Sequence, residues 1–374
     1  MTRPGAAVER RAPAVARADD RAAARRGVVS FPDVIPQNPY QRLLYEHLAA
    51  EGIELVPDGS LRLGQLVRSR RRVGYLHFHW PQSCYRRDGA APLAWAAAGL
   101  FAVRLAAARA LGYRIVWTIH QPVPHESRRP RLDRLAAHAL GRLATTRLAH
   151  DAATAAAARP VVGGRPVTIV PHGSYVGVYP PGRSRDAVRA DLGIEAGDVV
   201  FLAFGHVRAY KSLDVLLDAF ARLEAPHARL VIAGLPVDDA SARLVESAAA
   251  RDPRIVPVLR FVDDAEVTGL FAAADAAVVS RGDGGTSGSI VLALSLGVPV
   301  VAAALPAYAE LLGGGAAGWA FAAGNPGSLR AALADAATDG TRDDRAAAAR
   351  ALAEERAWPA IAAATAAAMR GRAA

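Results

Sequence analysis

Two segments of the C-terminal half combine glycine, basic and hydroxyl residues in a pattern that suits phosphate groups. The first, residues 205–212, contains Gly205, Arg208 and Lys211 between an apolar run typical of a buried strand and a helical pattern. Glycine lets the backbone turn beside a ligand, arginine offers phosphate a planar fork, and lysine adds a mobile point charge. Because free N–H groups and the positive dipole end also meet at a helix start, the segment predicts a diphosphate site. An ordinary strand–turn–helix with surface basic residues is the alternative.

The second segment, residues 281–289, also stands between an apolar run and an apolar helical pattern. Its glycines and hydroxyls can form a nest of backbone donors for an anion, and Ser287 or Ser289 can cap the helix or bind a ligand oxygen. A plain cap on a loop is the alternative, but four glycines and three hydroxyls exceed what a cap requires. The predicted donor-side residues are Gly205, His206, Arg208, Lys211, Arg281, Thr286, Ser287, Gly288 and Ser289.

Histidines follow two apolar runs of the N-terminal half. His77, His79 and Trp80 end the first run, and His120 ends the next, with His125 shortly after. A histidine at the carboxyl end of a strand can contact substrate oxygens or act as a general base. A packed or capping histidine is the alternative, favoured for His77 and His125, and zinc is a further alternative that no cysteine or carboxylate spacing supports. The predicted acceptor-side residues are Asn38, Tyr40, Trp80, His120 and His125.

The elements that must position these residues alternate between strands and helices, which is the pattern of parallel βαβ units. The C-terminal half predicts strands at 199–204, 228–233, 255–258, 276–279 and 298–302 and helices at 213–223, 240–250, 265–273 and 289–296. The N-terminal half predicts strands at 73–79, 113–119, 145–149 and 167–170 and helices at 41–51, 93–111 and 131–140. Because most of these strands are apolar throughout, both faces of each sheet must be covered. The fold class is therefore α/β, with two doubly wound Rossmann-like domains facing a cleft and ligands outside the carboxyl ends of the strands.

Composition narrows the partners and the compartment. The formal net charge of +10 suits nucleic acid, an anionic membrane or phosphorylated substrates, but scattered arginines without interleaved aromatic residues disfavour nucleic acid. Cys84 is the only cysteine, so an intrachain disulfide is excluded and a reducing cytoplasm is favoured. The apolar run 92–103 is too short to span a bilayer and predicts a buried helix or one that touches a membrane surface.

The sequence motifs resemble those of GT-B glycosyltransferases, especially bacterial polysaccharide and glycolipid enzymes. VVFLAFGHVRAYKSLDVLLDAF resembles the segment whose arginine and lysine bind donor diphosphate, which implies that role for Arg208 and Lys211. VWTIHQPVPHE resembles a segment with a histidine at the sugar-transfer point, here His120, so the predicted catalytic residues are His120, Arg208 and Lys211. Many retaining members carry Glu-x7-Glu in the donor loop, whereas Gly284 and Leu292 stand at those positions, which leaves the stereochemical outcome open.

The composition, the strand–helix pattern and the resemblance together predict a domain organisation. Residues 1–27 are expected to form a disordered basic tail, 28–175 the acceptor-side domain, 176–353 the nucleotide-sugar domain, and 354–374 a closing helix that packs back on the N-terminal domain. GGGAAG at 313–318 fits a dinucleotide motif, but it follows a helical stretch and leads into no helix, so it has little weight.

The implied activity is transfer of a sugar from a UDP- or GDP-linked donor to a glycan, lipid-linked or small-molecule acceptor in polysaccharide or glycolipid biosynthesis. Neither a cofactor nor a metal is expected, because protein cations would neutralise the diphosphate. Peripheral contact with an anionic membrane and a cytoplasmic location, on the inner face of the plasma membrane, are also expected. A GT-B-fold sugar-nucleotide 2-epimerase and a non-catalytic nucleotide-sugar-binding protein are the alternatives.

Overall fold

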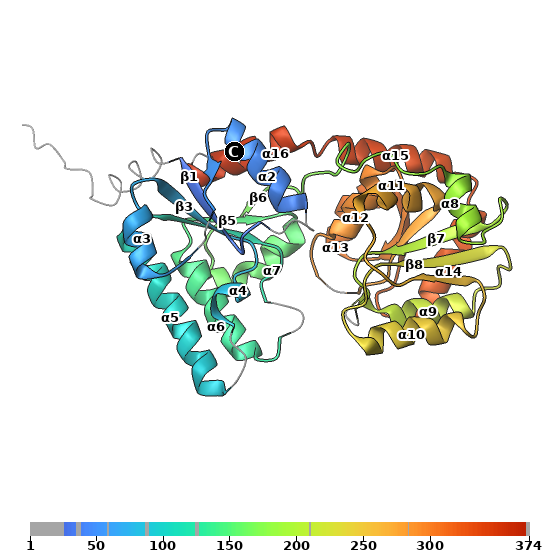
Figure 1. The fold of residues 1–374 in the computed structure, drawn as a ribbon, viewed down its shortest axis with the longest axis horizontal. Helices are drawn as coiled ribbons and strands as arrows, with labels where there is room; N and C mark the ends of the chain where they lie inside the picture. Colours follow the sequence, from blue (N-terminus) through green and yellow to red (C-terminus); the bar gives the residue numbers. More distant parts are fainter. Residues whose placement is uncertain are drawn as a thin grey trace, which may run out of the picture.

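The computed structural model describes residues 26–34, 39–57, 60–86, 90–123, 127–208, 211–282 and 284–371, and it contains two six-stranded parallel sheets in separate lobes (Figure 1). The N-terminal sheet has the order β2-β1-β3-β4-β5-β6, and the C-terminal sheet has the order β12-β11-β10-β7-β8-β9. All strand pairs within both sheets are parallel. This confirms the predicted α/β class with two doubly wound domains.

The N-terminal strands are β1 (Gly27–Phe31), β2 (Glu54–Leu55), β3 (Val73–Phe78), β4 (Arg114–Ile119), β5 (Thr146–Ala149) and β6 (Thr168–Ile169). The helices of this lobe are α2 (Pro39–Ala50), α3 (Leu63–Ser69), α4 (Gln82–Tyr85), α5 (Ala91–Ala110), α6 (Pro130–Leu143) and α7 (Ala152–Val162). Strand β1 begins at Gly27, a residue that the sequence assigned to the tail, because its N–H donates to the carbonyl of Arg72 beside β3. The remainder of the predicted tail, apart from Arg26, lies outside the described residues.

The C-terminal strands are β7 (Val199–Phe204), β8 (Ala228–Ala233), β9 (Ile255–Val258), β10 (Ala276–Val279), β11 (Val300–Ala303) and β12 (Gly318–Phe321). The helices of this lobe are α8 (Arg185–Asp191), α9 (Leu213–Ala221), α10 (Asp239–Ala249), α11 (Asp264–Ala273), α12 (Gly288–Ser295), α13 (Pro306–Leu311), α14 (Pro326–Thr338) and α15 (Arg342–Glu354). The first four strands have the predicted bounds. Strand β11 begins two residues later than predicted, because the Val298 N–H still bonds to Ala293 of α12 and Pro299 has no N–H to donate.

The strand order of the C-terminal sheet explains where a ligand belongs. Counted within the lobe, the order is 3-2-1-4-5-6, so the direction of winding reverses between β7 and β10. Loops from these two strands diverge to opposite faces and leave a crevice at their carboxyl ends. The two predicted phosphate-binding segments directly follow these strands, which places both at the same switch point.

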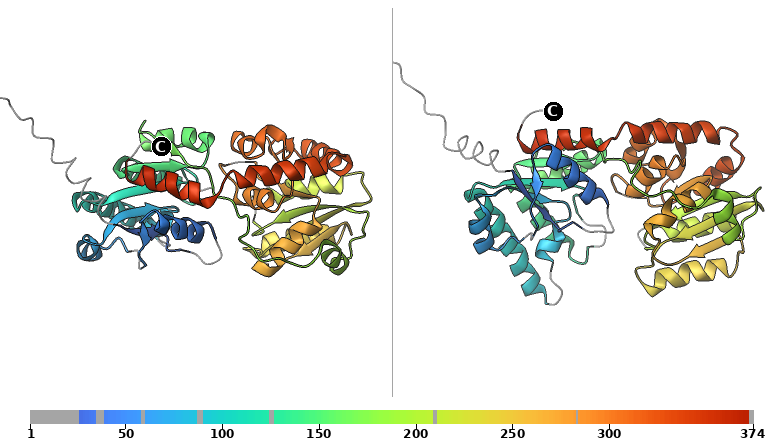
Figure 2. Two further views of the ribbon diagram at one scale, coloured as in Figure 1. Left: turned by 90° about the horizontal axis from the view of Figure 1, so that it is seen from above. Right: turned by 45° about the horizontal axis from the view of Figure 1, so that its top comes forward.

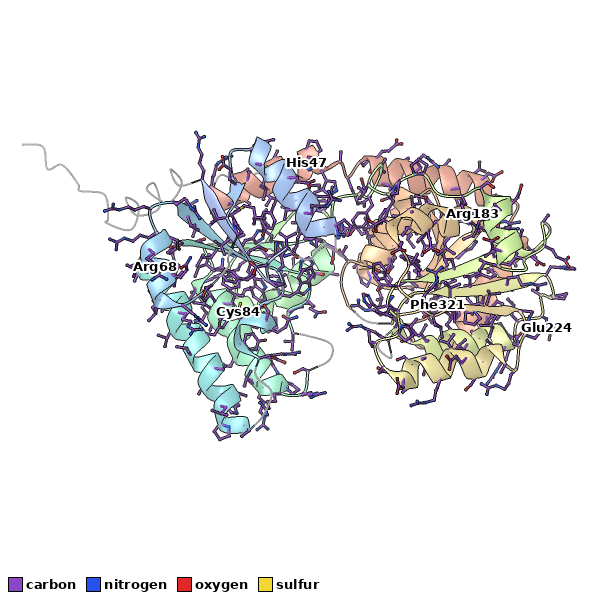
Figure 3. The ribbon with its side chains drawn as sticks, in the orientation of Figure 1. His47, Arg68, Cys84, Arg183, Glu224 and Phe321 are labelled. Atoms are coloured by element: carbon purple, nitrogen blue, oxygen red, sulfur yellow. The ribbon has the colours of Figure 1, made fainter. Side chains whose placement is uncertain are left out.

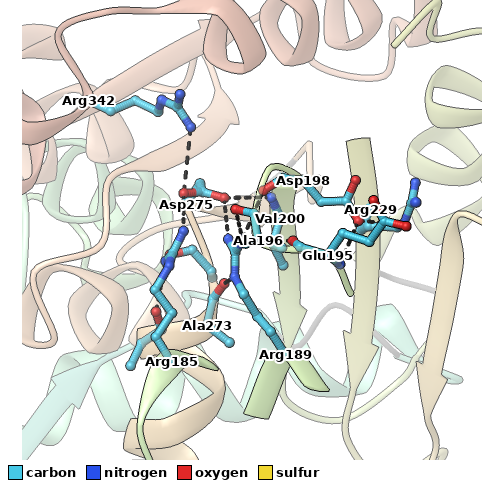
Figure 4. Close-up of polar contacts among 12 residues, drawn as sticks. Arg185, Arg189, Glu195, Ala196, Asp198, Val200, Arg229, Ala273, Asp275 and Arg342 are labelled. Carbon is cyan, nitrogen blue, oxygen red and sulfur yellow. Dashed lines mark hydrogen bonds and ion pairs between the residues drawn. The ribbon is translucent and has the colours of Figure 1, made fainter. Parts of the chain in front are cut away.

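The amino ends of strands in the same sheet are fixed by a partly buried network of charges (Figure 4). Asp275, just before β10, accepts hydrogen bonds from Arg185 at 2.6 Å, Arg189 at 2.8 Å and the backbone N–H of Val200 at 2.7 Å. Arg342 of α15 lies 3.5 Å from the same carboxylate. These contacts tie α8 and α15 to the amino ends of β7 and β10 and leave the carboxyl ends to the ligand.

The last helix, α16 (Trp358–Met369), crosses back to the N-terminal lobe and lies along α2 (Figure 2). The Arg114 side chain of β4 donates to the Met369 carbonyl at 2.8 Å. The Trp358 indole donates to the Ser174 carbonyl at 2.6 Å, and a Cβ at Gly173 would collide with the same indole ring. The interlobe connection is therefore packed against the helix that bridges the two lobes.

Both lobes have apolar cores, and the charged side chains labelled in Figure 3 lie at the surface. Phe321 is buried in the C-terminal core, whereas Arg183 and Glu224 project from the surface of that lobe and Arg68 from the outer end of the N-terminal lobe. Cys84 is half-buried against the N-terminal core, which agrees with a packed cysteine.

Candidate active site

The floor of the predicted donor cavity contains Gly205 at the end of β7, which lies against Gly234 at the end of β8. Gly205 has a φ of +96°, and an added Cβ would lie 3.1 Å from the Lys211 Nζ and 3.9 Å from the Ser289 Oγ. Gly234, at the end of β8, has a φ of +148°, and a Cβ there would collide with the Gly205 carbonyl. Only glycine tolerates both the positive φ angle and the close contact between these two backbone segments. Because neither residue has a side chain, the turn after β7 leaves space for a ligand.

Lys211 lines the same cavity beside Gly205 and is held at both ends. Its Nζ donates to the carbonyl of Phe204 at 3.1 Å, and its own carbonyl accepts from the Ser280 hydroxyl at 2.7 Å. Burial, together with the positive charges of Arg208 and Arg281, lowers the pKa of Lys211 to about 8. Lys211 is also the only lysine among 45 basic residues, and the other 44 are arginines. Since arginine replaces lysine everywhere else, the site selects the compact ammonium group.

His206 lies in the same cationic environment. Burial lowers its pKa first, and the charges of Arg208 and Lys211 lower it further. The donor site therefore collects positive charge that a bound anion would stabilise.

The polar groups of the loop before α12 cap this helix and contact the N-terminal lobe. The Ser287 side chain accepts from the Ile290 N–H at 3.4 Å and so caps α12. The Thr286 N–H and hydroxyl both donate to Asp151 at the start of α7, at 3.0 and 2.6 Å. Thr286 therefore joins the two lobes, while the start of α12 at Gly288 and Ser289 faces the donor cavity.

Asp151 connects this loop to the N-terminal lobe. It also accepts from the Thr154 N–H at 2.6 Å, which makes it the N-cap of α7. Burial alone would raise its pKa, but the hydrogen bonds from Thr286 and Thr154 lower it. The carboxylate is therefore ionised at neutral pH and holds the donor loop through charge-assisted bonds.

A cavity of about 530 Å³ lies over the ends of β7 and β10. Its described lining includes all nine predicted donor-side residues and no carboxylate. From the described part of the N-terminal lobe only Trp80 reaches it. The cavity is large enough for a ligand of nucleotide size and lies where the two lobes meet.

The facing edge of the N-terminal sheet is lined by histidines. Each of the four neighbouring strands β3, β4, β5 and β6 is followed within a few residues by one, respectively His79, His120, His150 and His172. Their rings approach one another, with centroids 5.6 Å apart for His79 and His120 and 5.0 Å apart for His120 and His150. Tyr40 lies beneath them and contacts all four rings.

Burial governs the charge of this cluster. It lowers the pKa of His77 and of His172 to about 3, and it lowers the pKa of His79, His120 and His150 in the same direction. The histidines are therefore uncharged at neutral pH and can accept a proton only when a neighbouring charge stabilises the product. Among the described residues, no group of three or more metal-ligating side chains has the arrangement of a metal site.

His120 connects the cluster to the donor cavity. Its ring stacks on Trp80 with centroids 4.5 Å apart and an interplanar angle of 11°. Its Nε2 lies 3.3 Å from the Nδ1 of His79. Because Trp80 lines the donor cavity, His120 lies where the carboxyl ends of the N-terminal strands face those of the C-terminal strands.

The structure thus brings together His120, Trp80 and the predicted donor-side residues. Tyr40 is buried and supports the histidines from below. Asn38 and His125 lie outside the described residues. The sequence analysis missed Asp151, His150 and His172. His150 and Asp151 directly follow the predicted strand 145–149, so their position as polar residues at a strand end was a signal for both.

Two doubly wound lobes, joined by a bridging C-terminal helix and enclosing a cationic pocket at a switch point, define a GT-B-type glycosyltransferase. Residues 184–352 match the family model for glycosyl transferases group 1. The chain is 31% identical over 310 residues to the GDP-mannose:glycolipid 4-beta-D-mannosyltransferase of Xanthomonas campestris pv. campestris, with 80% of each chain covered. The chain therefore belongs to the group 1 glycosyltransferases and is an enzyme that transfers a sugar from a nucleotide-sugar.

Solved structures support the same fold. Anabaena HepE in complex with UDP is similar with a TM-score of 0.68 and 20% identity, covering 94% of this chain and 95% of HepE. Sucrose-phosphate synthase from Thermosynechococcus elongatus gives a TM-score of 0.70 and 16% identity, covering 91% and 97%. WaaG, a glycosyltransferase involved in lipopolysaccharide biosynthesis, gives 0.64 and 16%, covering 91% and 98%. These relatives give no support to the alternative of a sugar-nucleotide 2-epimerase.

Proposed function

We propose that the enzyme transfers mannose from GDP-mannose to the sugar of a membrane glycolipid, as a step of polysaccharide or glycolipid biosynthesis. The similarity to the GDP-mannose:glycolipid 4-beta-D-mannosyltransferase carries this proposal, because it extends over 80% of both chains and so includes both lobes. Incubation with labelled GDP-mannose, UDP-glucose and UDP-galactose and a lipid-linked oligosaccharide acceptor tests it. Transfer of label from GDP-mannose alone supports the proposal, and transfer only from a UDP-sugar contradicts it.

The donor's diphosphate binds over the floor formed by Gly205. Arg208 and Lys211 neutralise its charge, and the N–H groups at the start of α12 and the Ser289 hydroxyl donate hydrogen bonds to its oxygens. Charge develops on the diphosphate as the bond to the sugar breaks, so the cations act mainly in the transition state. Because side chains supply this charge, the proposal includes no metal, and activity should survive EDTA.

The acceptor hydroxyl approaches from the N-terminal lobe, beside the stacked pair of Trp80 and His120. Trp80 offers an aromatic face that suits a sugar ring, and His120, half-buried and uncharged, takes the proton of the attacking hydroxyl. Domain closure around this point would exclude water and limit hydrolysis of the donor.

The outer surface of the N-terminal lobe suits a lipid-linked acceptor. Helix α5 has the length and apolar composition to cross a membrane, yet it packs on the lobe through a stripe of buried residues, namely Ala94, Ala98, Phe101, Leu105 and Ala108. On its other side Leu93, Leu100 and Val103 are exposed, with Leu93 64% exposed. An apolar face of this kind lies in a membrane interface while the helix remains part of its domain.

Charge complements this apolar face. Residues 60–150 carry 16 arginines and three acidic residues, a formal charge of +13, against +10 for the entire chain. Arg68 and the run Arg70–Arg72 lie on or after α3, which packs beside α5. We therefore place the enzyme in the cytoplasm, on the anionic inner face of the membrane, through α3 and α5.

Sedimentation with vesicles tests this surface. Wild type should bind phosphatidylcholine vesicles that contain phosphatidylglycerol and bind pure phosphatidylcholine weakly. The variant Leu93→Gln/Leu100→Gln/Val103→Gln should stay in the supernatant, whereas the matched control Leu244→Gln/Phe261→Gln, with exposed apolar residues of the other lobe, should sediment. Equal sedimentation of the two variants would contradict the assignment.

A further inference from the structure

A chain of hydrogen bonds runs inward from His120 through the N-terminal lobe. His120 Nε2 lies 3.3 Å from His79 Nδ1, and His79 Nε2 lies 3.0 Å from the Tyr45 hydroxyl. The same hydroxyl lies 3.1 Å from His77 Nδ1, and His77 Nε2 lies 2.8 Å from the Thr118 hydroxyl. His77 and His79 reach one hydroxyl because alternate residues of a strand share a face. The chain thus leads from His120, which stacks on the cavity-lining Trp80, to the interior of the lobe.

When the Tyr45 hydroxyl donates its proton to one of the two histidines, this chain has two self-consistent arrangements. A neutral histidine has one ring N–H and one acceptor nitrogen, and a tyrosine hydroxyl has a single proton to donate. In one arrangement each proton points away from the cavity, so that His120 donates from Nε2 to His79 and keeps an unprotonated Nδ1. In the other, all protons are reversed and His120 carries its proton on Nδ1. The two buried histidines and Tyr45 therefore determine which nitrogen of His120 is a base.

The first arrangement suits the position of His120. Within the described residues its Nδ1 has no hydrogen-bond partner, and the ring is half-buried beside Trp80 and the donor cavity. His79, Tyr45 and His77 are each at most 3% exposed, so no bulk water competes for their hydrogen bonds. A network of this kind, buried and with each ring nitrogen paired, holds a single geometry.

We propose that His79, Tyr45 and His77 are positioning residues that fix His120 as the Nε2–H tautomer and share the proton it receives during sugar transfer. The proposal rests on the proposed role of His120 as the base. The acceptor O–H bond breaks and its proton goes to His120 Nδ1, while the acceptor oxygen bonds to the anomeric carbon. The bond from that carbon to the diphosphate breaks, and its electron pair leaves with the diphosphate. The positive charge on His120 is then shared with His79 through the Nε2–H.

The groups around the chain set its response to pH. His150, His172 and Tyr40 face His120 from the neighbouring strand ends and from α2. Two charged groups act on the neighbouring histidines, namely Asp151 on His150 and Arg356 on His172. Neither contacts the chain itself, so the basicity of His120 depends first on the acceptor at its Nε2.

Two substitutions at one position separate this role from a structural one. In His79→Asn the amide reaches as far as Nδ1 and still accepts from His120, whereas in His79→Gln it reaches as far as Nε2 and contacts Tyr45 instead. We expect kcat of the Asn variant to fall by about tenfold, because its link to Tyr45 is lost, and that of the Gln variant to fall by about 100-fold, with KM for the donor unchanged. Without an acceptor for the Nε2–H, the acid limb of the kcat profile should also move to lower pH. Equal kcat values and unshifted profiles for the two variants would overturn the proposal.

Tyr45→Phe tests the next link, with Tyr113→Phe as its control. Both tyrosines are buried in the same lobe and hydrogen-bonded, but Tyr113 bonds to the Leu66 carbonyl, away from the site. Tyr45→Phe should lower kcat by about tenfold and shift the acid limb, whereas Tyr113→Phe should lower only the melting temperature. A loss of stability without a shift in the pH profile in both variants would show that Tyr45 is merely structural.

Nitrogen NMR of histidine-labelled protein tests the proposal without any substrate, so its result does not depend on the proposed function. We expect the His120 ring of wild type to be the neutral Nε2–H tautomer and the His79→Gln variant to populate the Nδ1–H tautomer. A wild-type His120 in the Nδ1–H form, or a tautomer that is indifferent to His79→Gln, would overturn the proposal. Failure of sugar transfer with the expected tautomer would instead count against the assigned donor.

Discussion

The two strand edges that meet at the site are built from opposite kinds of residue. The C-terminal edge has cations over a glycine floor, with Arg208 and Lys211 beside the start of α12. The N-terminal edge has uncharged histidines and tyrosines, mostly buried and hydrogen-bonded to one another. The C-terminal edge suits a ligand with a permanent negative charge. The N-terminal edge suits a group that accepts a proton only during the reaction. In the proposed mechanism this difference gives each lobe one half of the transfer, namely the leaving group for the C-terminal lobe and the attacking hydroxyl for the N-terminal lobe.

The largest effect should come from removing the charge of the cationic edge. In Arg208→Ala/Lys211→Ala, kcat/KM should fall by at least about 10⁴-fold, because each cation contributes about 10²–10³-fold to leaving-group stabilisation. The control is Arg183→Ala, an exposed arginine of the same lobe. Intact donor binding and turnover in the double variant would show that the diphosphate binds elsewhere.

The second-largest effect should come from changing the shape of a cation at the C-terminal edge while its charge is kept. Lys211→Arg keeps the positive charge, but the guanidinium is too large for the buried position beside Phe204 and Gly205. We expect kcat/KM to fall by about 100-fold, and Arg208→Lys to be the milder change because Arg208 lines the open cavity. Full activity of Lys211→Arg, measured by steady-state kinetics, would mean that only the positive charge at this position matters for transfer, and not the shape of the side chain.

The pH dependence of donor binding should distinguish the two edges by a smaller factor. Lys211 has a pKa of about 8 in the free enzyme, so it is charged below that pH and neutral above it. A bound diphosphate favours the charged form, so GDP affinity should fall by up to about tenfold for each pH unit above 8. Calorimetry with GDP in wild type measures this fall. The same titration in Lys211→Ala should be flat over that range, and an equal fall would assign the titration to another group.

The smallest effect concerns the contact that joins the edges. Thr286→Val removes the hydroxyl bond to Asp151 but keeps the backbone bond, so KM for the donor should rise by about three- to tenfold. The control is Thr268→Val, whose hydroxyl bonds to the Pro180 carbonyl at the surface of the same lobe. A larger change in kcat than in KM would indicate that the contact acts on the acceptor edge instead.

The sequence predicted the C-terminal edge better than the N-terminal edge, for a physical reason. Strands such as β7 and β10 are apolar throughout, so their ends are visible as sharp changes of composition, and polar residues directly after them are read as a site. Composition also indicates Lys211, because it is the only lysine in the chain.

The N-terminal edge depends on contacts that no local pattern contains. Tyr45 of α2 and His79 after β3 are far apart in sequence, and only the packing of α2 on the sheet brings them together. The bond between Thr286 and Asp151 depends on the placement of one lobe against the other. Helix α7 was also missed, because its alanine-rich sequence has no clear apolar stripe and is defined mainly by the Asp151 cap.

A crystal soaked with GDP tests the central claim most directly. The account predicts that the diphosphate lies over Gly205, within hydrogen-bond distance of Arg208 and the N–H groups at the start of α12, with Lys211 beneath it. A diphosphate bound at another place, with this cavity unchanged, would contradict the assignment of the C-terminal edge and with it the proposed division of labour between the two lobes.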